Sequence, residues 1–297
     1  MSAGSLRKGR IDTIGLMLPL FTQGESFSAT LFMPLADGIQ TVLSKHKLDL
    51  AIFQSHSSED ELTQLKRIAG RRQVDGLIVS NTLRHDPRLD FLAKQGFPFL
   101  AFGRSDSGGE HAWIDLDIEA AAEQAVERLA GFNHRRIAVV IPGPDAMQAY
   151  IYLKSYKRAL KRCGIPFDSS LVRQGEYNER GGYRVVESLL ASATPPSAIM
   201  FQSDCMAIGA YRKLHEVGLT PGKDIAIITG VLTGEVQDYL SPRLTGFTLA
   251  IRELGMRMAE AMLARVPGIG AYYNNALVQE IWPIQLKMRA SDINALG

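Results

Sequence analysis

Short apolar runs alternate along almost the whole chain with longer stretches in which apolar residues recur every three to four positions. Thr13–Leu18 is a nearly continuous apolar run, which is typical of a strand buried on both faces. The stretch that follows places Leu35, Ile39 and Val42 on one face of a helix. Strands that alternate with helices of this length indicate right-handed βαβ units and parallel sheets. The sequence therefore predicts an α/β protein.

The same reasoning divides the chain into elements. The predicted strands are 13–18, 48–53, 76–79, 99–102, 113–114, 137–141, 172–175, 198–201, 225–228 and 278–288. The predicted helices are 31–43, one capped by Ser57 or Ser58, 120–129, 146–162, 178–191, one capped by Ser203 that runs to 217, and 251–263.

These strands are too many for one sheet of ordinary width, so the sequence favours two doubly wound parallel-sheet lobes joined by a hinge. The strand–helix pattern restarts after Phe102, which suggests where the chain changes lobe. We expect an N-terminal lobe of 11–104 plus 245–270 and a C-terminal lobe of 105–244 plus 271–291. Residues 1–10 are expected to be a leader and linker remnant.

Composition excludes several classes of protein. The net charge is +2, and the only dense basic cluster, Arg7, Lys8 and Arg10, is interpreted as a solvated tail rather than a nucleic-acid-binding face. Two widely separated cysteines fit a reducing compartment, and we expect a cytoplasmic protein. The apolar run 11–21 is short and interrupted by Asp12, which argues against a signal peptide and against a membrane span.

Signatures of catalysis and of cofactors are missing from the sequence. The segment 103–107 departs from the nucleophile-elbow pattern at its last position, and Gly268-Ile269-Gly270 lacks the third glycine of a dinucleotide site. Asp115 and Asp117 would point to opposite faces of a strand, so we expect turn and capping bonds from them rather than acid–base chemistry. The six histidines are scattered. We therefore expect no enzyme activity, no metal and no cofactor.

Six spaced motifs, in the right order over about residues 10–290, are similar to those of lactose-repressor-type (LacI) transcriptional regulators. They are 13–16 (Thr-Ile-Gly-Leu), 74–79 (Val-Asp-Gly-Leu-Ile-Val), 97–104 (Phe-Pro-Phe-Leu-Ala-Phe-Gly-Arg), 131–138 (Gly-Phe-Asn-His-Arg-Arg-Ile-Ala), 203–210 (Ser-Asp-Cys-Met-Ala-Ile-Gly-Ala) and 242–245 (Pro-Arg-Leu-Thr). No single motif is decisive, but their order makes the resemblance specific.

The resemblance implies the periplasmic-binding-protein type I fold, with a small-molecule effector, a sugar, bound between lobes at the carboxyl ends of the strands. It also implies a homodimer formed through the first lobe. Operator DNA would be bound through a helix-turn-helix domain that this chain lacks, with Arg7–Arg10 as the remnant of its linker. A periplasmic solute-binding protein of the same fold remains the alternative, and an α/β enzyme is a third hypothesis.

The family's ligand positions carry over to this chain with gaps. They fall on Phe32, Arg104, Tyr152, Glu176, Tyr177, Ser203 and Leu232. Tyr152 stands where the family has an arginine, Leu232 where it has an aspartate, and Ser203 where it has an asparagine. The ligand is therefore expected either to be less polar than a typical sugar or to be bound through Arg104, Glu176, Gln202 and the loop 22–28.

Overall fold

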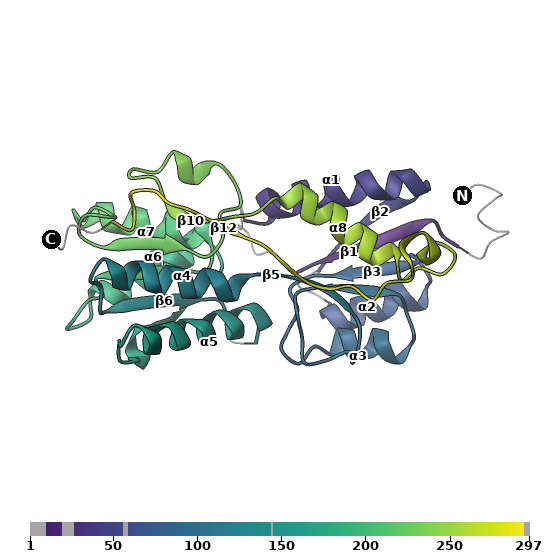
Figure 1. Cartoon of the computed structure of the whole chain (residues 1–297), viewed down its shortest axis with the longest axis horizontal. Helices are drawn as coiled ribbons and strands as arrows, with labels where there is room; N and C mark the ends of the chain where they lie inside the picture. The colour runs from purple at the N-terminus through teal and green to yellow at the C-terminus, as the bar shows by residue number, and fades with distance from the viewer. Residues whose placement is uncertain (1–9, 20–26, 56–58, 144, 294–297) are drawn as a thin grey trace. The chain divides into compact units, whose positions relative to one another are not determined.

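The computed structural model describes residues 10–19, 27–55, 59–143 and 145–293, and the chain divides into two compact units. The first lobe comprises 1–22, 32–116 and 250–282, and the second lobe comprises 23–31, 117–249 and 283–297. Each lobe contains a six-stranded sheet with helices on both faces (Figure 1). The predicted α/β class with two doubly wound lobes is confirmed.

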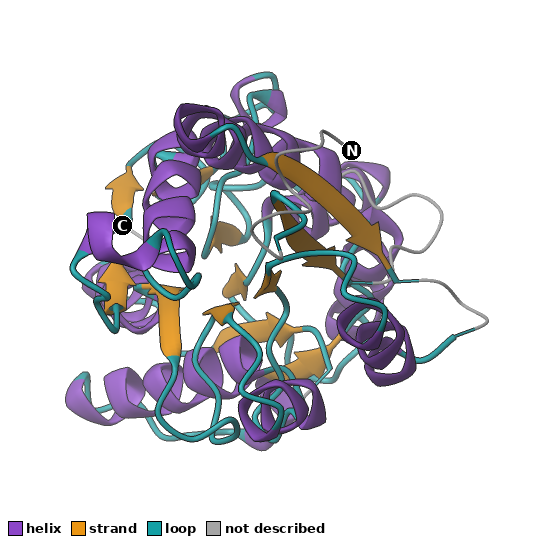
Figure 2. Cartoon of the chain, turned by 90° about the vertical axis from the view of Figure 1, so that its right-hand side faces the viewer, coloured by secondary structure: helices purple, strands orange, loops and turns teal. Residues whose placement is uncertain are grey.

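In the first lobe every strand pairing is parallel. The strand order is β11 (Gln279–Trp282), β5 (Ala112–Leu116), β4 (Phe99–Phe102), β3 (Gly76–Val79), β1 (Thr13–Leu18) and β2 (Asp49–Gln54). Helices α1 (Phe27–Leu43) and α8 (Ile251–Leu263) cover one face, and α2 (Glu61–Gly70) and α3 (Pro87–Lys94) cover the other. Figure 2 looks onto this lobe and shows its strands flanked by helices.

The second lobe has the same design with one antiparallel edge strand, β12. The strand order is β12 (Gln285–Lys287), β10 (Thr245–Thr248), β9 (Ala226–Thr229), β8 (Ala198–Phe201), β6 (Ile137–Ile141) and β7 (Val172–Gln174). Helices α4 (Ile118–Gly131) and α5 (Met147–Arg162) pack together, as do α6 (Glu179–Leu190) and α7 (Asp204–Glu216). No helix within the described ranges is long and apolar enough to cross a bilayer.

Several predicted elements differ from those observed. Helix α3 was not predicted, and α2 is capped by Asp60, which accepts a hydrogen bond from the Thr63 N–H at 2.9 Å. Ser57 and Ser58, the predicted caps, lie outside the described residues. The single strand predicted at 278–288 is wrong: Pro283, which has no N–H to donate, lies between β11 and β12, and these two strands belong to different sheets.

The observed lobe boundary also differs from the expected one. β5 continues the first sheet, with Ala101 opposite Trp113, so the chain leaves the first lobe at 116–117 rather than after Arg104. The chain returns at 249–250 and leaves again at 282–283, which assigns β10 to the second lobe and β11 to the first. Periodicity identifies each strand but carries no information about which strand it pairs with, so the boundary could not be read from the pattern.

Glycines allow one pair of helices in each lobe to pack backbone against backbone. In the second lobe, a Cβ at Gly209 of α7 would lie 1.7 Å from the carbonyl oxygen of Glu179, and one at Gly182 of α6 would lie 1.8 Å from that of Met206. In the first lobe, a Cβ at Gly38 of α1 would lie 2.0 Å from the carbonyl oxygen of Arg252. These positions exclude every side chain larger than hydrogen unless the helices move apart.

Candidate functional site

The carboxyl end of β8 in the second lobe carries a group of buried polar side chains. Gln202 follows the strand directly, and its side chain is almost fully buried; among the described residues its Oε1 has no hydrogen-bond partner. Ser203 is fully buried, and its hydroxyl lies 3.1 Å from the sulfur of Cys205. Ser203 is the N-cap residue of α7, as predicted, but its side chain makes no cap hydrogen bond. Its hydroxyl points toward other side chains instead.

Two tyrosines complete this group. The Tyr152 phenol is fully buried and donates to the carbonyl oxygen of Phe201, the last residue of β8, at 3.4 Å. Burial raises the pKa of Tyr152 and of Tyr177; at Tyr177 a hydrogen bond with Ser203 opposes the shift. Both phenols therefore stay protonated at neutral pH. The structure thus brings Tyr152, Tyr177 and Ser203 together, as the resemblance implies.

Asp204 holds the loop after β9 against the start of α7. Its carboxylate accepts the Thr233 N–H at 2.8 Å and the Thr233 hydroxyl at 3.2 Å, and it is almost fully buried. Burial raises the pKa of Asp204, although the bonds from Thr233 act against the shift. The Thr233 hydroxyl also lies 3.0 Å from that of Thr30, which belongs to the same unit. Asp204 therefore positions the loop 230–233 beside the buried polar group.

Two other predicted residues of the second lobe have different surroundings. Leu232 is 3% exposed and packs in the hydrophobic core, and its N–H donates to the carbonyl oxygen of Phe247 at 2.7 Å. Glu176 is half-exposed and pairs with Arg180 at 2.8 Å. The bonds from Arg180 lower the pKa of Glu176. Glu176 lines a shallow surface depression of about 290 Å³ together with Arg173 and Arg184.

In the first lobe, Arg104 follows β4 and pairs with a buried carboxylate of β5. Its Nε donates to Asp115 at 2.8 Å, its guanidinium lies 6.0 Å from the centre of the Trp113 ring, and a quarter of its side chain is exposed. Burial raises the pKa of Asp115, and the hydrogen bond and charge of Arg104 act against that shift. Asp117 caps α4 by accepting the Ala120 N–H, which confirms the expected capping role.

Phe32 lies in α1 and is 8% exposed, which places it among the buried hydrophobic residues of the first lobe. The loop 22–28, also considered for ligand binding, lies almost wholly outside the described residues. Of its residues only the backbone of Phe27 and Ser28 is described, as the first turn of α1.

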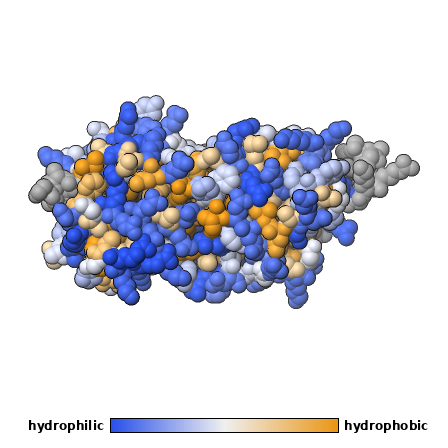
Figure 3. Space-filling model, viewed as in Figure 1, coloured by the Kyte–Doolittle hydropathy of each residue, from blue (hydrophilic) through white to orange (hydrophobic). Residues whose placement is uncertain are grey.

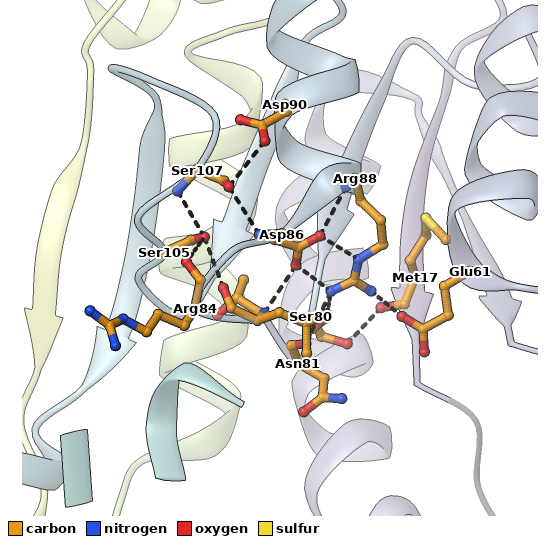
Figure 4. Close-up of polar contacts among 12 residues, drawn as sticks. Met17, Glu61, Ser80, Asn81, Arg84, Asp86, Arg88, Asp90, Ser105 and Ser107 are labelled. Carbon is orange, nitrogen blue, oxygen red and sulfur yellow. Dashed lines mark hydrogen bonds and ion pairs between the residues drawn. The ribbon is translucent and has the colours of Figure 1, made fainter. Parts of the chain in front are cut away.

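A buried ion pair that sequence reasoning missed organises the carboxyl end of the first sheet (Figure 4). The Arg88 guanidinium donates to both carboxylate oxygens of Asp86, at 3.0 and 2.7 Å, and to Glu61 at 2.5 Å. It also donates to the carbonyl oxygens of Ser80 and Asn81, directly after β3. Asp86 followed by Pro87 is a helix-start signal that could have revealed α3 and this pair.

The chemistry available at these strand ends is hydrogen bonding and aromatic contact. Burial raises the pKa of the Cys205 thiol to about 12, so this sulfur is not a nucleophile at neutral pH. The unpartnered Gln202 Oε1 can accept a hydrogen bond from a hydroxyl or amine, and guanidinium donors such as Arg104 can pair with neighbouring hydroxyls. The arrangement suits reversible binding of a polar small molecule.

Comparison with known proteins gives consistent matches along the chain. Residues 126–291 match the family described as periplasmic binding protein-like domain. The HTH-type transcriptional regulator AglR of Rhizobium meliloti is 30% identical over 285 residues, which cover 90% of this chain and 78% of that protein.

Two solved structures share the fold along almost the whole chain. A regulatory protein of the LacI family from Chloroflexus aggregans superposes with a TM-score of 0.78 and 29% identity, covering 95% of this chain and 99% of that one. A LacI family transcriptional regulator from Enterococcus faecium with bound ribose gives a TM-score of 0.76 and 26% identity, covering 94% and 98%.

Proposed function

Since this chain belongs to the LacI family of transcriptional regulators, we propose that it is the effector-sensing part of a sugar-responsive repressor that acts on operator DNA in the cytoplasm. The relatives support a regulator rather than an enzyme. They also favour this function over the alternative of a periplasmic solute-binding protein, because the similarity to regulators extends over 90% of the chain. The ribose bound to the Enterococcus faecium regulator supports a sugar as the class of effector.

The observation that carries the proposal is the buried acceptor at Gln202 beside the hydroxyl of Ser203. A buried acceptor without a partner costs free energy, and a ligand hydroxyl that donates to it recovers that cost. We propose that the ligand contacts come from Phe32 and Arg104 in the first lobe. In the second lobe we propose Tyr152, Glu176, Tyr177, Ser203 and Leu232, with Gln202 added. The surroundings of Glu176 and Leu232 make them the weakest of these.

A thermal-shift screen of monosaccharides and disaccharides tests the proposal. A ligand at a hundred times its dissociation constant stabilises the native state by about 2.7 kcal/mol, so a matching sugar should raise the melting temperature by several degrees. Gln202→Met removes the acceptor at nearly constant length and should reduce that shift. A panel in which no sugar raises the melting temperature, while a nucleotide or amino acid does, would overturn the sugar assignment.

We expect Arg104→Ala to weaken binding of the identified sugar about ten- to hundredfold, or ~1–3 kcal/mol, because the ligand loses a guanidinium donor. Titration calorimetry measures the affinity, and the melting curve without ligand measures the separate effect of leaving Asp115 unpaired. Arg84→Ala is the matched control, since Arg84 is in an exposed pair with Asp106 in the same lobe. If affinity is unchanged while the unliganded melting temperature falls, Arg104 only braces β4 against β5.

We also propose a homodimer formed through the first lobe. Figure 3 shows a visible face that is mostly hydrophilic with small apolar groups. On the first lobe, Met33 of α1 is 61% exposed and Ile52 of the edge strand β2 is 47% exposed. Exposed apolar side chains of this kind suit an interface between two copies.

Light scattering at micromolar concentration should therefore give twice the chain mass of 32.6 kDa. Met33→Glu combined with Ile52→Glu should shift the equilibrium to monomer, because two buried carboxylates would face an apolar interface. Tyr239→Glu is the control, since Tyr239 is 84% exposed in the second lobe. A wild-type chain that scatters as a monomer would contradict the proposed dimer.

A further inference from the structure

The cations of the first lobe fall into two groups. Most of its arginines are in ion pairs with carboxylates, including Arg67 with Glu59, Arg88 with Asp86 and Arg257 with Glu280. Within the described part of this lobe, seven lysines and arginines have no carboxylate within ion-pair distance. One of them, Lys66, lies over the Phe91 ring. The other six, here called the amino-edge cations, are Lys45, Lys47, Arg71, Arg72, Lys94 and Arg265.

All six amino-edge cations are in segments where a helix has just ended, at the end of the lobe where the strands begin. Lys45 and Lys47 precede β2, Arg71 and Arg72 precede β3, Lys94 precedes β4, and Arg265 follows α8. All six residues are exposed. Five of them lie at the end of a helix or between that helix and the next strand, and Arg265 lies just after α8. In a parallel sheet all strands start at the same end, so these positions lie along that one end, which is called the amino edge here.

The hydrogen bonds confirm that these segments are neighbours. The Asp49 N–H donates to the Asp12 carbonyl oxygen at 2.9 Å, and the Asp75 N–H donates to that of Thr13 at 2.8 Å, which joins the starts of β2, β1 and β3. His46 contacts the hydroxyl of Tyr273 at 2.7 Å, which brings the segment after α8 to the same edge. Adjacent strands are about 4.8 Å apart, so the cations that precede β2 to β4 span about 15 Å.

Carboxylates at this edge neutralise little of the positive charge. Asp12 pairs with Arg10 at 2.6 Å, and Asp75 accepts the N–H groups of Ile11 and Asp12 at 2.9 and 2.7 Å. Asp49, and the exposed Glu110 just before β5, are the other carboxylates near the strand starts in the described part of this lobe. Cations near helix C-termini interact favourably with the helix dipole, which explains their position but not the lack of carboxylate partners beside them. The result is an exposed face with an excess of positive charge.

We propose that the amino-edge cations contact the phosphate backbone of duplex DNA without reading its sequence. The inference rests on the proposed function, because it assigns a second DNA contact to a regulator already expected to bind an operator.

The inference also changes the expectation, drawn from composition, that the chain has no nucleic-acid-binding face. No basic face was expected because these cations are far apart in the sequence, and the fold brings them together. The chain also enters the first lobe at this edge, through Arg10 and β1. Phosphate contacts of this kind position a protein on DNA and make its affinity dependent on salt.

Fluorescence anisotropy tests the inference, with the complete chain titrated into a labelled duplex of random sequence at 20 to 150 mM salt. We expect weak binding whose logarithm falls linearly with the logarithm of salt concentration. The variant Lys45→Ala/Lys47→Ala/Arg71→Ala/Arg72→Ala should lose at least tenfold in affinity at the lowest salt, and its salt slope should fall by about three to four. The control changes four exposed cations of the described part of the second lobe, Lys154, Lys161, Lys223 and Arg243, each to alanine.

The outcomes separate this inference from the proposed function. Loss of duplex binding in the amino-edge variant but not in the control supports it, provided that both variants melt at the wild-type temperature. Equal loss in both variants, or no duplex binding by the wild type, overturns it. Binding of the wild type to vesicles with anionic lipid, with no preference for DNA, also overturns it. The sugar screen is read independently, so a chain that responds to sugar but ignores DNA loses only this inference.

Discussion

Replacing Gly209 by alanine should destabilise the second lobe by about 3 kcal/mol or more, even though alanine is the better helix former. The new Cβ would lie 1.7 Å from the carbonyl oxygen of Glu179, which belongs to the backbone of α6 and cannot rotate away. Helices α6 and α7 would have to separate, which opens the apolar core between them and the sheet. Urea denaturation of the variant and the wild type measures the change in the free energy of unfolding.

Gly131→Ala provides the matched control. Gly131 is the last residue of α4, and a Cβ there would have no heavy atom within 4 Å. This substitution should stabilise the protein by up to about 1 kcal/mol, because alanine loses less backbone entropy in a helix. If Gly209→Ala were also neutral or stabilising, the two helices would not be in backbone contact.

Arg88→Met should cost about 3–5 kcal/mol, the usual effect of removing one partner from a buried ion pair. Arg88 is 3% exposed and Asp86 is fully buried, so the carboxylate would lose its counter-charge without gaining water. The substitution also leaves the carbonyl oxygens of Ser80 and Asn81 without their guanidinium donor. Urea denaturation at neutral pH measures the effect.

The pH dependence should change sign between the wild type and this variant. Burial acts to raise the pKa of Asp86, but the hydrogen bonds and charge of Arg88 outweigh it and hold the pKa below its usual value of 3.8. In the wild type, the stabilisation that comes from ionised Asp86 is therefore present above pH 4 and is lost as the pH falls through the lowered pKa. Without the Arg88 guanidinium, burial, the largest influence on this pKa, is opposed only by the backbone N–H groups of Leu83 and of residue 88, so the pKa should rise and stability should fall as the pH rises through it.

An exposed ion pair in the same neighbourhood controls for loss of charge. Arg84 pairs with Asp106 at 3.0 Å, and both side chains are more than 40% exposed. Arg84→Met should therefore cost at most about 1 kcal/mol. If Arg88→Met costs as little stability as Arg84→Met, the buried pair is not coupled. The same conclusion follows if the double variant Asp86→Asn/Arg88→Met loses as much free energy of unfolding as the two single variants added together.

Strands buried on both faces, and one helix with a regular apolar stripe, were the most predictable parts of this fold. β3, β4, β6, β8 and α8 begin and end where the apolar pattern places them, because burial dictates a continuous apolar run or a regular stripe. Helix α3 was missed because it is only eight residues long and its stripe is too short to stand out. The strand at 278–288 was predicted as one element because the pattern does not show that its two halves join different sheets. Pro283 separates these halves, β11 and β12.

The candidate site was predictable only where its residues lie directly at strand ends. Ser203 lies in one of the six motifs, and the resemblance implies Tyr177 in the loop after β7; the structure brings both together with Tyr152. Leu232 lies one loop further on, and its direction depends on a backbone bond to Phe247 that no pattern encodes. The partner of Arg104 was hidden for a similar reason: Asp115 reaches it only because β4 and β5 are adjacent in one sheet.

The long excursion of the chain into the second lobe, from residue 117 to residue 249, has a consequence for synthesis on the ribosome. Residues up to 116 supply five of the six strands of the first sheet, but α8 and β11 follow only after residues 117–249 have been made. At about 5–20 residues per second, roughly 10 to 30 s pass before residue 282 follows residue 116. During that time one face of the sheet lacks α8, and β5 presents an open edge to chaperones and to other nascent chains. The second lobe, by contrast, has five strands and all four of its helices from the single stretch 117–249.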